Sequence, residues 1–172
     1  VEEARLHVLG NEPVLGALSE KALFSSWLAY AGEEDVESVL SHLKDRGPRE
    51  NYLVGLALGR YGQTAMAEST LIESGEQLKN SPNALDQWMA PRSFAAAARY
   101  GESEYRGDQA ARAWELGQSD PMVVVDLGWY RDSIGDKDEA ARLFDLVDGL
   151  GHQSAVAHFN RGWFFLDFGD KQ

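Results

Sequence analysis

The sequence contains no cysteine, and this absence excludes several kinds of structure at once. A disulfide framework, a zinc ribbon, an iron–sulfur site and a thiol nucleophile all require cysteine. The absence does not decide the compartment, because a chain without thiols suits the cytoplasm and the periplasm equally well.

Long apolar runs are also missing. No stretch reaches the roughly 18 apolar residues that suggest a membrane span. The chain opens with Val1-Glu2-Glu3 and not with a basic start followed by an apolar run, so we expect no signal peptide in this segment. The start at Val1 and the end at Gln172 are interpreted as cut points in a longer or processed protein.

Basic residues are few. The chain has 16 Lys and Arg against 28 Asp and Glu, which gives a net charge of −12. This balance argues against nucleic-acid binding, which needs a basic face, and it favours a protein partner that carries basic segments. The 172 residues are 44% apolar and 26% charged, a composition typical of a soluble folded domain.

Motifs for catalysis and for cofactor or metal binding were also not found. No two histidines lie three or four residues apart, so a helical zinc pair is excluded. The chain has no glycine-rich phosphate loop and no nucleophile elbow. The acidic residues from Asp132 onward fail as a calcium loop, because the twelfth position is Leu143. We therefore predict no catalytic residue, no cofactor and no metal, and a protein that is not an enzyme.

Helical periodicity, interrupted by glycine and proline, is what the sequence does have. The segments between these interruptions run for about 10 to 18 residues, a length that favours helices over strands. Val36, Val39, Leu40 and Leu43 recur on one helical face. The β-branched run at 123–125 lies inside a helical period. These patterns predict an all-α fold.

Two places predict sharp helix boundaries. Asp120 before Pro121 predicts a helix start, because an aspartate oxygen caps free backbone N–H groups and proline suits the first turn. Gly135 before Asp136 predicts that one helix ends in a left-handed residue and that the next helix begins with a capping side chain.

A repeat is visible in the last third of the chain. Residues 123–137 and 157–171 are offset by 34 residues and agree at five of fifteen positions, where about one identity is expected by chance. The five identical pairs are Gly128/Gly162, Trp129/Trp163, Gly135/Gly169, Asp136/Asp170 and Lys137/Lys171. Weaker copies occur earlier, where Gly55, Gly62, Ala67 and Leu71 have the spacing of Gly128, Gly135, Ala140 and Phe144.

This 34-residue unit resembles the tetratricopeptide repeat (TPR) family, most closely over 121–172. The resemblance implies a single TPR-like domain over 1–172, built as a right-handed α-α superhelix (solenoid) of helix–turn–helix repeats that are irregular toward the N-terminus. The candidate repeats are 18–47, 49–80, 84–118, 121–150 and an incomplete 154–172, and the candidate turn glycines are Gly32, Gly62, Gly107, Gly135 and Gly169. The alternative is an unrelated helical bundle with glycine turns.

Glycine at position 128 predicts a close helix crossing. In the middle of a helix, glycine costs about 1 kcal/mol relative to alanine. That cost is offset only where another helix passes too close for a side chain. We expect the second helix, with Ala140 and Phe144, to make this approach.

The resemblance also implies a concave surface, lined by the first helix of each pair, that holds a protein or peptide. By this comparison the binding residues are Tyr52, Leu56, Arg60, Val125, Trp129, Asp132, Phe159, Trp163 and Leu166. Trp129 is equally well explained as a core residue, and for Trp163 the core explanation depends on whether chain beyond Gln172 covers it. If no chain follows Gln172, we expect Phe159, Trp163 and Phe168 to form an exposed apolar end that promotes homo-oligomer formation.

The function expected from the sequence is therefore a non-catalytic scaffold for protein–protein interaction that binds a peptide, a folded protein or another copy of itself. Two alternatives stay open. One is a helical accessory or regulatory domain of a larger enzyme or of a secretion or assembly component. The other is a helical regulator that binds a small molecule.

Overall fold

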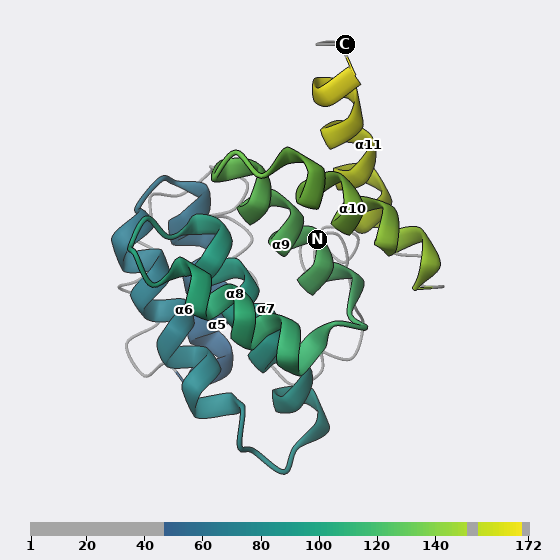
Figure 1. Ribbon diagram of the computed structural model, residues 1–172. Helices are drawn as coiled ribbons and strands as arrows, with labels where there is room; N and C mark the ends of the chain where they lie inside the picture. The colour runs from purple at the N-terminus through teal and green to yellow at the C-terminus, as the bar shows by residue number, and fades with distance from the viewer. Residues whose placement is uncertain (1–46, 151–154, 170–172) are drawn as a thin grey trace, which may run out of the picture.

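The computed structural model describes residues 47–150 and 155–169, and within these ranges every regular element is a helix. The prediction of an all-α fold is confirmed for this part of the chain. Figure 1 shows the arrangement. The helices are α5 (Pro48–Arg60), α6 (Thr64–Leu78), α7 (Ala84–Tyr100), α8 (Arg106–Gly117), α9 (Pro121–Ser133), α10 (Lys137–Gly149) and α11 (Ala155–Gly169). The candidate repeat 18–47 and the turn at Gly32 lie outside the described residues, apart from Gly47.

The helix boundaries predicted around α9 and α10 are confirmed. Asp120 caps α9 by accepting a hydrogen bond from the backbone N–H of Met122 at 2.9 Å, and Pro121 occupies the first turn. Asp136 caps α10 by accepting from the N–H of Glu139 at 3.4 Å. Both caps satisfy N–H groups that the first turn of a helix leaves without a partner.

Two glycines make the tight turns between paired helices. Gly62 joins α5 to α6 with φ = 74°, and Gly135 joins α9 to α10 with φ = 83°. No other residue in the described ranges adopts a positive φ. This conformation is accessible to glycine without steric cost, so the predicted role of both turn glycines is confirmed.

The predicted turn at Gly107 is wrong, because Gly107 lies in the first turn of α8. The connection from α7 is stabilised by the carboxylate of Glu68 on α6. This carboxylate accepts hydrogen bonds from the N–H groups of Glu102 and Ser103 at 3.3 and 3.2 Å and from the Ser103 hydroxyl. The backbone N–H groups of this connection are therefore satisfied by a side chain that is distant in sequence, and the chain turns without a left-handed glycine.

The crossing predicted at Gly128 is present. A Cβ atom added at Gly128 would lie 2.9 Å from Cε2 of Phe144, and one added at Gly55 would overlap the side chain of Leu71. Neither position has room for a Cβ atom, so the absence of a side chain at each glycine allows the two helices of the pair to pack closely. The situation at Gly162 is different, because no atom lies within 4 Å of an added Cβ there.

The first helices of successive pairs contact one another: α5 contacts α7, α7 contacts α9, and α9 contacts α11. Between α7 and α9 two ion pairs cross the interface. Arg92 donates to both oxygens of Asp120 at 2.7 and 3.0 Å, and Arg99 donates to Asp126 at 2.7 Å. Helix α11 lies at the end of the row and projects beyond the other described helices (Figure 1).

Candidate functional site

The nine predicted binding residues do not form one exposed surface. The structure divides them by burial into three groups. Tyr52 and Val125 are buried; Leu56, Trp129 and Asp132 are half-buried; Arg60, Phe159, Trp163 and Leu166 are exposed. The exposed residues come from the two ends of the helix row, and three of the four belong to α11.

Val125 is wrong as a binding residue. Its exposed fraction is 0%, and it belongs to the core cluster that contains Phe144 and Phe164. Tyr52 is similarly inaccessible, with 8% exposed, and burial raises the pKa of its hydroxyl. A partner cannot contact either side chain without displacing the core.

Trp129 is half-buried and packs against the same core cluster. Its indole N–H donates to Oδ1 of Asn160 at 2.9 Å. The edge of its ring packs on Phe144, with 5.2 Å between centroids, and on Phe164, with 6.1 Å. The side chain therefore joins α9, α10 and α11, and of the two explanations left open for Trp129 the structure favours the core.

The remaining predicted binding residues of α5 and α9 do not form a binding surface with α11. Leu56 packs against the second core cluster, around Leu71 and Met89. Asp132 forms an ion pair with Lys137 at the turn between α9 and α10. Arg60 is exposed in the last turn of α5. None of these three residues joins the exposed residues of α11.

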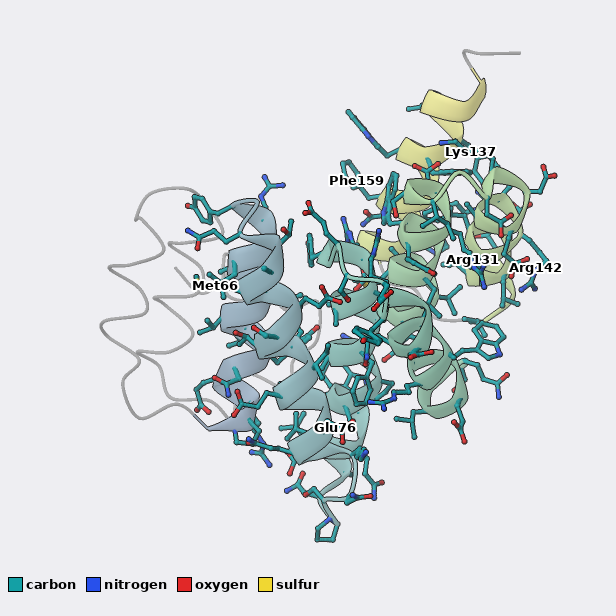
Figure 2. All side chains as sticks on the ribbon, turned by 60° about the vertical axis from the view of Figure 1, so that its left-hand side comes forward. Met66, Glu76, Arg131, Lys137, Arg142 and Phe159 are labelled. Atoms are coloured by element: carbon teal, nitrogen blue, oxygen red, sulfur yellow. The ribbon has the colours of Figure 1, made fainter. Side chains whose placement is uncertain are left out.

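The exposed face of α11 is the candidate site. Phe159, Trp163 and Leu166 have exposed fractions of 69%, 61% and 68% and follow the i, i+4, i+7 spacing of one helical face. The rings of Phe159 and Trp163 are stacked, with centroids 6.3 Å apart. Figure 2 labels Phe159 at the α11 end of the molecule. We call these three residues together with Gly162, which lies on the same face, the α11 face.

The opposite side of α11 is anchored to the body of the molecule by its apolar residues. Phe164 is buried and stacks on Phe144 with 4.5 Å between ring centroids. Asn160 accepts the hydrogen bond from Trp129. These contacts fix the rotation of α11 about its axis, so the α11 face points away from α9 and α10.

Ion pairs hold the same side of α11. Arg161 contacts Asp145 and Asp148 of α10 at 3.0 and 3.3 Å, and His158 contacts Asp148 at 3.2 Å. All four groups are partly exposed, so each pair contributes little on its own. Together they place the Arg161 guanidinium and the His158 ring against the acidic residues of α10.

The ion pairs between α7 and α9 are structural. Burial raises the pKa of the Asp126 carboxyl above its ordinary value, and the guanidinium of Arg99 opposes that shift. Asp120 is occupied by both nitrogens of Arg92 and by its capping bond to Met122. Each carboxylate thus has a structural partner, and neither is placed to act on a ligand.

No group of three or more histidine or acidic side chains gathers to bind a metal ion among the residues that the structure describes. None of the helices described is both long and apolar enough to cross a membrane.

Comparison of the chain with protein-family models, with curated proteins and with solved structures finds no match.

The sequence did not single out Gly162 as a binding residue, although it lies in the middle of the α11 face. The signal that identifies it is the 34-residue repeat, which aligns Gly162 with Gly128. Gly128 receives the side chain of Phe144, whereas Gly162 is open. An open glycine between exposed aromatic and aliphatic side chains makes a notch in an apolar surface.

Proposed function

We propose that this chain is a TPR-like helical repeat scaffold without catalytic activity, and that it binds a protein through the α11 face. The observation that carries the proposal is the exposure of Phe159, Trp163 and Leu166 on one face of a helix whose opposite side is anchored. Contiguous exposed apolar patches mark interaction sites on soluble proteins.

Support for the TPR-like part comes from two helix pairs that pack alike. Gly55 and Gly128 receive Leu71 and Phe144 from the second helix of their own pairs. Gly62 and Gly135 turn the chain with a positive φ in both pairs. Ala67 and Ala140 are fully buried in both. A repeated unit that uses the same four positions is what a helical repeat scaffold requires.

Leaving the α11 face exposed to water costs free energy. Burying a side chain of the size of Phe, Trp or Leu stabilises a complex by about 1.5–3 kcal/mol relative to leaving it in water. Tryptophan and other aromatic residues are also enriched at the energetic centres of interfaces. Three such apolar residues on one face of an anchored helix favour the binding of a partner, and none of them carries a group that could act in catalysis.

The net charge of the chain favours a partner that carries basic residues around its contact surface. The net charge is −12, and Asp145 and Asp148 of α10 lie beside α11. The net negative charge of the chain steers partners with basic segments toward it and raises the rate of association.

The test compares two triple variants as bait in extracts of the cells that make the protein. The first replaces Phe159, Trp163 and Leu166 by serine. The control replaces three exposed apolar residues away from α11, namely Tyr105, Leu116 and Ile134, by serine. We expect the α11-face variant to lose the proteins that the wild type retains and the control to keep them. Equal retention by both variants would overturn the proposal.

A further inference from the structure

We draw no further inference here: the strongest candidate, the apolar surface patch of Tyr105 and Ile134 where a hydrogen bond from Arg106 to Ser133 joins the start of α8 to the end of α9, carries nothing because nothing in the structure shows what covers it.

Discussion

Helices α9 and α11 carry the same motif, yet one is covered and the other is open. Gly128 and Trp129 of α9 lie under Phe144, whereas Gly162 and Trp163 of α11 face outward. The residue types are identical, so the difference arises from the elements that pack on each helix. A motif that builds the core in one helix pair is thus exposed on α11 among the described residues.

The largest expected contrast between the two helices is at the aromatic residues around the motif. Phe144→Ala should destabilise the protein by about 3–5 kcal/mol, because it removes a fully buried ring and leaves a cavity. Phe159→Ala should change stability by less than about 0.5 kcal/mol, since the side chain is exposed. Urea unfolding of dilute protein measures both. Similar losses for the two variants would mean that α9 and α11 are covered alike.

The glycines give the next contrast. Gly128→Leu should destabilise by about 1–3 kcal/mol through overpacking against Phe144. Gly162→Leu should stabilise the isolated chain by up to about 1 kcal/mol, because a glycine leaves an open helix position. Thermal unfolding of the two variants gives opposite shifts of Tm on this account. A Gly128→Leu chain with an unchanged Tm would show that the crossing is absent.

The two tryptophans differ by a hydrogen bond. Trp129→Phe removes the N–H that donates to Asn160 and should cost about 1 kcal/mol. Trp163→Phe removes no hydrogen bond to a described residue and should leave stability almost unchanged. The free energies of unfolding of the two variants check this, and a larger loss at position 163 would place Trp163 in the core.

The smallest expected effect is on the pH dependence of stability. It concerns Asp126 of α9, whose counterpart in the repeat is the non-titrating Asn160. Burial raises the pKa of Asp126 above its ordinary 3.8, so the folded chain holds this proton more tightly than the unfolded chain. The stability that this provides is present below pH 3.8 and is lost as the pH rises through the raised pKa. In the wild type, the free energy of unfolding should therefore fall as the pH rises above 3.8. In the Asp126→Asn chain this fall should be absent.

Asp86 is the control for this pH dependence, because its shift has the opposite sign. A hydrogen bond from Arg49 lowers the pKa of Asp86 below 3.8. Its contribution is present above that pH and is lost as the pH falls through the lowered pKa. Unfolding measured from about pH 3 to 6 should show opposite changes of slope for Asp126→Asn and Asp86→Asn. The same change in both would contradict the assignment.

Local signals in the sequence predicted much of this fold. The caps at Asp120 and Asp136, the turns at Gly62 and Gly135 and the crossing at Gly128 depend on residues close in sequence. Backbone and side-chain preferences act over such short distances, and the structure confirms all five features.

The features that the sequence could not predict depend on distant contacts. Gly107 is not a turn, because Glu68 of another helix stabilises the connection between α7 and α8. Val125 is buried although its counterpart Phe159 is exposed, and no local pattern separates the two positions. Tertiary packing decides which helix covers which face. The candidate site on α11 was therefore recognised only by comparing the exposed Gly162 and Trp163 with their covered counterparts Gly128 and Trp129.

The difference in coverage between α9 and α11 is tested most directly by hydroxyl-radical footprinting of the unmodified chain, read residue by residue by mass spectrometry. In dilute solution we expect Phe159 and Trp163 to be oxidised rapidly and Trp129 and Phe164 slowly. Oxidation of Trp129 as rapid as that of Trp163 in dilute solution would contradict the account.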